Sequence, residues 1–147
     1  MLSSLISANN IMLNVPATDW QDAIRKGGEL LLASGYIEER YITAMIDAVN
    51  EYGPYIVLVP GVAMPHSRGE NGVIKTGMSL ITLAEPIDFL DSENNPVRIV
   101  TCLGAAGSDA HIEALQDFAR LFESDENISA LKDADDIEEV IKLIQKF

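Results

Sequence analysis

Hydrophobic residues return at helical spacing in several parts of this chain, and each part predicts a helix. The first predicted helix begins near Trp20, behind a cap at Thr18 or Asp19, and ends at Gly35. The glycine pair at 27–28 weakens this prediction, because a glycine inside a helix costs about 1 kcal/mol relative to alanine.

A second helix is predicted over residues 38–52, where a hydrophobic stripe ends at Gly53-Pro54. A third begins after a glycine-rich segment at 104–107, and a short and a longer amphipathic helix follow it. The hydrophobic positions of these helices are Tyr41, Ile42, Met45, Ile46 and Val49; Ile112, Leu115, Phe118, Ala119 and Phe122; and Ile128, Leu131, Ile137, Val140, Ile141 and Ile144.

Between the helices, short apolar segments predict strands at residues 11–15, 55–60, 78–86 and 97–105. The second and the last are almost continuously apolar, which is typical of strands that are covered on both faces. A polar turn alone separates the last two strands, so they are expected to run antiparallel in part of the sheet. We therefore predict an α/β protein, a three-layer α/β/α sandwich with a central mixed β-sheet.

Composition and charge exclude some classes of function. The chain has 147 residues, which fits a single domain over residues 1–147. Ten basic residues against 23 acidic ones give a net charge of −13, which argues against nucleic-acid binding. Cys102 is the only cysteine and fits a reducing compartment. The first residues do not resemble a signal peptide, and no apolar stretch could span a bilayer, so we expect a cytoplasmic protein.

His66 is the first candidate for chemistry. Pro65 stiffens the chain just before it, and a polar loop containing Ser67 and Arg68 follows. Such a loop can offer backbone N–H groups and a cation to an anion beside the imidazole. The alternative is a histidine that is simply solvated in a loop.

His111 is the second candidate. Ser108 or Asp109 is a natural N-cap for the helix that starts here, and either one puts His111 in its first turn. A helix N-terminus favours a bound anion, to which a neutral imidazole could donate a hydrogen bond. The alternative is a histidine partly buried in helix packing. Both histidines follow predicted strands, where ligands collect in open α/β sheets.

Other chemistries have less support. The two histidines could hold a metal together with Asp109 or Asp88. However, the histidines are 45 residues apart and form no known ligand motif. Cys102 lies inside an apolar strand and reads as inert core. No motif of a serine hydrolase or of a nucleotide-binding loop occurs. We expect no metal and no cofactor.

Three segments of the sequence resemble a known family. The segments "PGVAMPHSR", "LAEPIDFL" and "NPVRIVTCLGAAGSDAHIEALQDFARLF" are similar to EIIA components of the bacterial phosphoenolpyruvate-dependent sugar phosphotransferase system (PTS), in the mannitol–fructose superfamily. The resemblance runs from about residue 38 to residue 122. The segment "NEYGPYIVLVPGVAMPH" is most similar to the branch that serves L-ascorbate.

The resemblance implies a phosphohistidine carrier and requires no cofactor or metal. His66 would accept a phosphoryl group from the histidine carrier protein HPr, with Nε2 as the nucleophile, and pass it to a cysteine of a cognate EIIB. The membrane transporter EIIC is then served indirectly. His111 would assist by hydrogen bonding, and Ser67, Arg68 and Asp109 are further candidates for binding the phosphoryl group.

One departure from the family pattern matters. Members serving mannitol or fructose carry an arginine around position 48 of this sequence, where Asp47, Ala48 and Val49 stand. Anion support should then come from backbone donors, His111 or Arg68.

Three matters stay open at this point. We expect an apolar docking rim near Val62, Met64 and Ile112 with acidic surroundings that suit basic partners. A PTS-linked regulatory module would present the same site as a transport component, and a histidine-based metallohydrolase would differ by binding zinc or manganese. The sequence leaves open whether the chain forms a homodimer.

Overall fold

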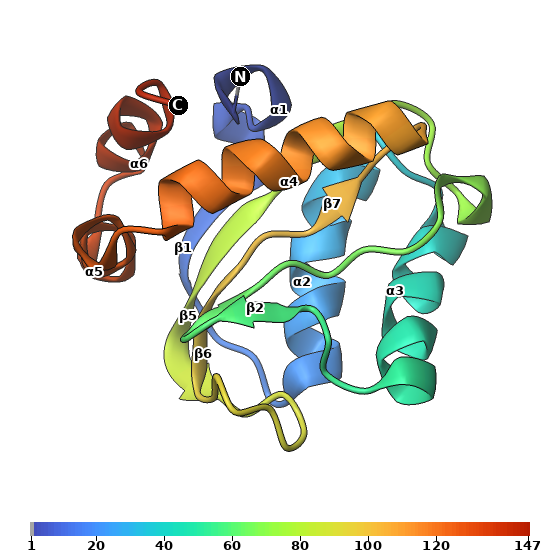
Figure 1. Cartoon of the computed structure of the whole chain (residues 1–147), viewed down its shortest axis with the longest axis horizontal. Helices are drawn as coiled ribbons and strands as arrows, with labels where there is room; N and C mark the ends of the chain where they lie inside the picture. Colours follow the sequence, from blue (N-terminus) through green and yellow to red (C-terminus); the bar gives the residue numbers. More distant parts are fainter. Residues whose placement is uncertain (1) are drawn as a thin grey trace.

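The computed structural model describes residues 2–147 as an α/β sandwich (Figure 1). The helices and strands lie at α1 (Leu2–Leu5), β1 (Ile11–Val15), α2 (Trp20–Ala33), α3 (Glu39–Tyr52), β2 (Val57–Val59), β3 (Val62–Ala63), β4 (Gly77–Met78), β5 (Leu80–Ile87), β6 (Val97–Val100), β7 (Leu103–Gly104), α4 (Ser108–Phe122), α5 (Asp125–Asp133) and α6 (Ile137–Ile144). Two short 3₁₀ turns, η1 (Ala8–Asn10) and η2 (Gly69–Asn71), complete the described elements. None of the helices in this part of the chain is long and apolar enough to cross a membrane.

The predicted mixed sheet is confirmed. Five strands pair in the order β1-β5-β6-β3-β2, and β4 pairs with β7 as a separate two-stranded ribbon. β1 runs parallel to β5, and β3 runs parallel to β6, while β5–β6 and β2–β3 are antiparallel. The β2–β3 connection is a tight turn at Gly61, whose φ of 81° lies in the region that glycine adopts readily.

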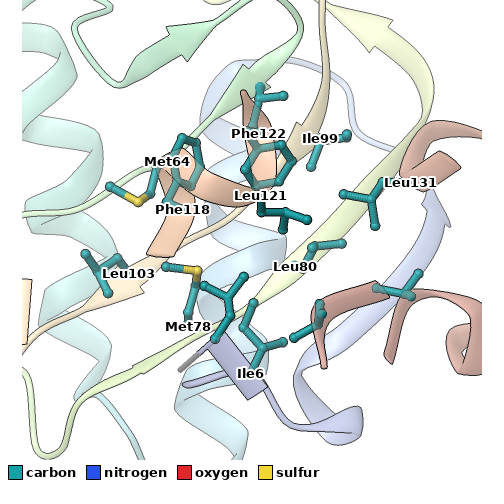
Figure 2. Close-up of a cluster of buried hydrophobic side chains, with 14 of the residues drawn as sticks. Ile6, Met64, Met78, Leu80, Ile99, Leu103, Phe118, Leu121, Phe122 and Leu131 are labelled. Atoms are coloured by element: carbon teal, nitrogen blue, oxygen red, sulfur yellow. The ribbon is translucent and has the colours of Figure 1, made fainter. Parts of the chain in front are cut away.

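Helices cover both faces of the sheet and create two hydrophobic layers. One layer joins α2 and α3 to the sheet through side chains such as Ile24, Met45 and Ile81. The other joins α1, α4, α5 and α6 to the opposite face, and Figure 2 shows part of it with Leu80 and Phe118. The alternation along β5 explains both layers, because successive side chains of a strand point to opposite faces.

The glycine pair that weakened the prediction of α2 has a packing reason. A Cβ atom added at Gly27 would lie 2.8 Å from the Cys102 Sγ atom, and one added at Gly28 would lie 2.8 Å from the Ile42 Cγ1 atom. Both distances are shorter than carbon or sulfur atoms tolerate without movement. The glycines therefore let α2 approach the sheet and α3 closely, and tertiary packing outweighs helix propensity.

Several local predictions need correction. The strand predicted over residues 55–60 is short and forms one edge of the sheet, where the Leu58 side chain is exposed. The buried face of α4 is turned relative to the predicted stripe: Ile112 and Ala119 are exposed, while Ala114 and Leu121 are buried. The helix at α1 was not predicted. It packs into the layer that contains α4.

Candidate functional site

The chain segment that carries His66 leaves the sheet under tight backbone control. The Met64 N–H group donates to the Ile56 carbonyl oxygen at 2.8 Å, and the Leu103 N–H group donates to the Pro65 carbonyl oxygen at 2.9 Å. Met64 and Pro65 are buried. His66, which follows them, is therefore presented from a rigid base, as the sequence around Pro65 predicts.

A hydrogen bond defines which nitrogen of the His66 ring is available. The Nδ1 atom lies 2.7 Å from the Met64 carbonyl oxygen. A carbonyl oxygen can only accept, so Nδ1 must carry the hydrogen. In the neutral ring Nε2 is then unprotonated and holds a lone pair, which is the state that a nucleophile requires.

The surroundings of His66 favour this neutral state. Burial lowers the pKa of His66 below the usual 6.5, the hydrogen bond to Met64 opposes the shift, and the charge of His111 adds to it. The side chain is only partly buried, so the ring remains accessible from the pocket described below.

This lowered pKa gives a testable expectation. We expect the His66 ring in the folded protein to titrate with a midpoint below 6.5, followed by NMR of its ring protons. The unfolded chain binds the proton more strongly, so this site's contribution to stability is present above the unfolded pKa of about 6.5 and is lost as the pH falls through the folded pKa. The urea-unfolded protein provides the reference titration. A midpoint at or above that reference would contradict the assigned environment.

His111 lies beside His66. Their ring centroids are 5.2 Å apart and the ring planes are inclined by 53°. His111 sits in the first turn of α4, where its backbone N–H group donates to the Gly107 carbonyl oxygen at 3.0 Å. The predicted cap was wrong: Gly107, and neither Ser108 nor Asp109, is the N-cap, and no side chain caps the helix.

Tyr55 is a neighbour of His66 that sequence reasoning missed. Its ring meets the His66 ring edge to face, with centroids 5.5 Å apart and planes at 87°. Its hydroxyl group lies 3.5 Å from the His66 carbonyl oxygen. The turn at Gly61 could have indicated this contact. It folds β2 back against β3, and this places Tyr55 beside the segment that holds His66.

The two histidines line an open pocket of about 1250 Å³. Its walls come from α3, the segment 66–71, the segment 105–108 and the start of α4. In Figure 1 the start of α4 and the loop after β3 meet at the same end of the molecule. The pocket therefore brings together segments that are far apart in the sequence.

The charges around this pocket are mixed. Asp47 and Glu51 line it from α3, around the position where the resemblance leads us to expect an arginine in members that serve mannitol or fructose. Arg68 lines it too, but its guanidinium group lies 3.7 Å from the Glu70 carboxylate and both side chains are well exposed. Exposed ion pairs of this kind are weak, so Arg68 can exchange Glu70 for a stronger anion.

Of the two remaining candidates for binding the phosphoryl group, Ser67 lines the pocket and Asp109 does not. Ser67 lines the pocket, and its Oγ atom accepts a hydrogen bond from Asn71 Nδ2 at 3.0 Å. Because that bond uses a lone pair, the hydroxyl hydrogen is free to donate. Asp109 is exposed and does not line the pocket.

The predicted docking rim is partly wrong. Val62 and Met64 are fully buried, because both side chains pack into the sheet layer that contains α4. Among the described residues, the large exposed apolar side chains at the pocket are Ile112, Tyr52 and Tyr55. The rim is therefore more aromatic than predicted.

Cys102 is buried core, as predicted. Its thiol is fully buried, and burial raises its pKa to about 12, which keeps it protonated and unreactive. Within residues 2–147, no three histidine, cysteine or acidic side chains cluster in a way that could hold a metal ion.

Comparison with known proteins supports the class that this fold and site suggest. The family model for "Phosphoenolpyruvate-dependent sugar phosphotransferase system, EIIA 2" matches residues 4–147. The chain is 42% identical over 144 residues to the "Ascorbate-specific PTS system EIIA component" of Shigella boydii serotype 4, an alignment that covers 97% of this chain and 94% of that protein. The protein of the same name from Escherichia coli strain K12 is 40% identical over the same shares.

Solved structures give the same result. The solution structure of the mannitol-specific cryptic enzyme IIA CmtB from Escherichia coli has a TM-score of 0.90 and 37% identity, and covers 99% of both chains. The mannitol enzyme IIA of Escherichia coli, in complex with phosphorylated enzyme IIB, has a TM-score of 0.87 and 28% identity over 97% of this chain and 100% of that one. The chain belongs to the EIIA 2 family of the sugar phosphotransferase system. It is a phosphocarrier component of that system.

Proposed function

We propose that this protein, a single cytoplasmic domain over residues 1–147, carries a phosphoryl group on Nε2 of His66. It receives the group from phosphorylated HPr and delivers it to a cysteine of a cognate EIIB, which serves the membrane transporter EIIC. The observation that carries the proposal is the bond from Nδ1 of His66 to the Met64 carbonyl oxygen, which leaves Nε2 as the free nucleophile at the pocket.

The chemical step is an in-line transfer between nitrogens. The lone pair on Nε2 of His66 forms the new N–P bond, while the donor's N–P bond breaks and its electron pair returns to the donor imidazole. The hydrogen on Nδ1 stays at the Met64 carbonyl oxygen, which stabilises the positive charge that the ring gains. In the second transfer a cysteine thiolate of EIIB forms an S–P bond, while the N–P bond breaks and its electron pair returns to Nε2 of His66.

The other side chains of the pocket stabilise charge on the moving group. His111 faces His66 across 5.2 Å and donates a ring N–H to a phosphoryl oxygen. The Ser67 hydroxyl group and the Arg68 guanidinium group provide further donors from the loop that follows His66. Asp109 lies outside the pocket lining and has no part in this mechanism.

Both partners use the same exposed rim, since each must reach one histidine. Tyr52, Tyr55 and Ile112 offer aromatic and apolar surface, and Asp47 and Glu51 make the α3 side acidic. A partner with an apolar centre and basic flanks fits this arrangement. The basic flank would also supply the cation that α3 does not provide.

L-ascorbate is the substrate that this relay serves, in our proposal. Relatives at 40–42% identity over almost the whole chain carry that name. The acidic residues Asp47 and Glu51 on the pocket wall of α3 fit the same branch, because the mannitol branch is expected to have an arginine there. The mannitol-named structures, at 28–37% identity, are less similar in sequence.

The test is a two-step phosphotransfer assay in vitro. Purified protein is incubated with phosphorylated HPr, then with a panel of EIIB proteins that includes ascorbate and mannitol members. We expect one phosphoryl group per chain and fastest delivery to the ascorbate EIIB. Equal or faster delivery to the mannitol EIIB would contradict the substrate, and failure to accept phosphate from HPr would contradict the function.

A further inference from the structure

A tyrosine hydroxyl group lies buried behind the two histidines. Tyr41 belongs to the first turn of α3 and has no exposed surface. Its hydroxyl oxygen accepts a hydrogen bond from the Ser67 N–H group at 2.8 Å. The hydroxyl hydrogen donates to the Leu103 carbonyl oxygen at 2.8 Å, and the Ser67 carbonyl oxygen, at 3.1 Å, is the second acceptor in reach.

The two segments that this hydroxyl group joins are the ones that lead to the histidines. Ser67 directly follows His66, and Leu103 opens β7, which runs through the segment 105–107 into α4 and His111. Tyr41 thus contacts both segments from a third element, α3. Its one hydroxyl group bonds to both segments, because it accepts from the Ser67 N–H group and donates to the Leu103 carbonyl oxygen.

The backbone around Tyr41 shows how closely these segments approach. The Leu103 N–H group bonds to the Pro65 carbonyl oxygen, and a Cβ atom added at Gly69 would lie 2.5 Å from the Ala105 carbonyl oxygen. Burial raises the pKa of Tyr41 well above its usual value, so the hydroxyl group keeps its hydrogen throughout the working pH range. It can therefore donate continuously.

We infer that the Tyr41 hydroxyl group is a positioning group for phosphoryl transfer, because it fixes the segment of His66 against the segment that leads to His111. The inference rests on the proposed function. The two hydrogen bonds of Tyr41 keep the rings at the separation that lets His111 reach a group on Nε2 of His66. A buried hydroxyl group that only filled space could be replaced by hydrogen, but this one satisfies a buried N–H group and a carbonyl oxygen on different segments.

The test is Tyr41→Phe, which removes the hydroxyl group and keeps the ring. We expect the variant to fold, with kcat for uptake of phosphate from HPr reduced about 10- to 100-fold, because small misplacements of reacting groups cost rates of this order. The KM for HPr should change less than about twofold, since the rim that contacts the partner is untouched. Urea unfolding checks the stability of each variant.

Ser79→Ala is the matched control. It removes a buried hydroxyl group that donates to the Gly27 carbonyl oxygen at 2.9 Å, away from the pocket. We expect unchanged kcat and KM for this variant. A loss of kcat in both variants to the same degree would mean that general loosening explains the effect, and it would overturn the inference.

The remaining outcomes are equally decisive. Normal kcat in folded Tyr41→Phe, or a raised KM with normal kcat, would overturn the positioning role while leaving His66 as the carrier. If wild-type protein takes no phosphate, the proposed function fails and the inference fails with it. If Tyr41→Phe does not fold, hydrogen exchange in the wild-type protein provides the test. The Ser67 amide should be protected, because it donates to the Tyr41 hydroxyl oxygen. Exchange at the rate of an open loop would overturn the inference.

Discussion

Replacing His66 with alanine is expected to abolish phosphorylation of this protein by phosphorylated HPr. The bond of Nδ1 to the Met64 carbonyl oxygen leaves a free lone pair on Nε2 of His66, and His111 lies beside it as a donor for the phosphoryl group. Incorporation of labelled phosphate that is stable to alkali and labile to acid measures the effect. The expected residual level is that of a sample without HPr.

The matched control for this variant is His111→Ala, which keeps His66 and should still accept phosphate. His66 is partly exposed at the pocket, so its loss should not unfold the protein. Circular dichroism and urea unfolding establish that. Phosphate uptake by folded His66→Ala at a rate near that of wild type would show that another residue is the carrier.

Replacing His111 with alanine should slow phosphoryl transfer about 100-fold, because the loss of one well-placed donor to the developing charge costs on the order of 10²–10³ in rate. The ring is 5.2 Å from that of His66, centroid to centroid, and no second histidine lies near it in the described chain. Single-turnover measurements of both uptake from HPr and delivery to EIIB give the rate of the chemical step. The site of phosphorylation should remain His66.

His111→Gln tests the reason for this loss. A glutamine amide can donate a hydrogen bond from a similar position, so this variant should recover part of the rate that alanine loses. Equal rates for wild type and His111→Ala in both directions would remove His111 from the mechanism. Equal losses for the alanine and glutamine variants would mean that the ring itself is needed.

Much of the architecture follows from patterns within the sequence. The periodic stripes of α2 and α3 and the apolar strand β5 predict their elements, because each must bury one face or two. The turn between β5 and β6 predicts that these two strands are antiparallel, and together with the parallel pairs β1–β5 and β3–β6 they make the sheet mixed. The two histidines stood out because each follows a strand, where an α/β sheet gathers its ligands.

What the sequence did not reveal depends on contacts between distant segments. Tyr41 lies 25 residues before His66 on another element, and nothing in its own stripe distinguishes it from a core residue. The face of α4 was misjudged because Ile112 is apolar yet faces the pocket and solvent, where a partner can cover it.

The acidic residues on the α3 side of the pocket affect how firmly the protein holds a phosphoryl group. Asp47 and Glu51 disfavour a phosphoryl anion near α3, and Arg68 is paired with Glu70. The phosphorylated protein should therefore hold its group less firmly alone than in contact with a basic partner. A basic partner would then stabilise the charge of the phosphoryl group while it moves between the two proteins.

The most direct test of this account is the position of the phosphoryl group on the protein. Two-dimensional NMR of ¹⁵N-histidine-labelled protein, recorded before and after reaction with phosphorylated HPr, identifies both the residue and the ring nitrogen. We expect phosphate on Nε2 of His66, with hydrogen retained on Nδ1. Phosphate on Nδ1 of His66, or on His111, would contradict it.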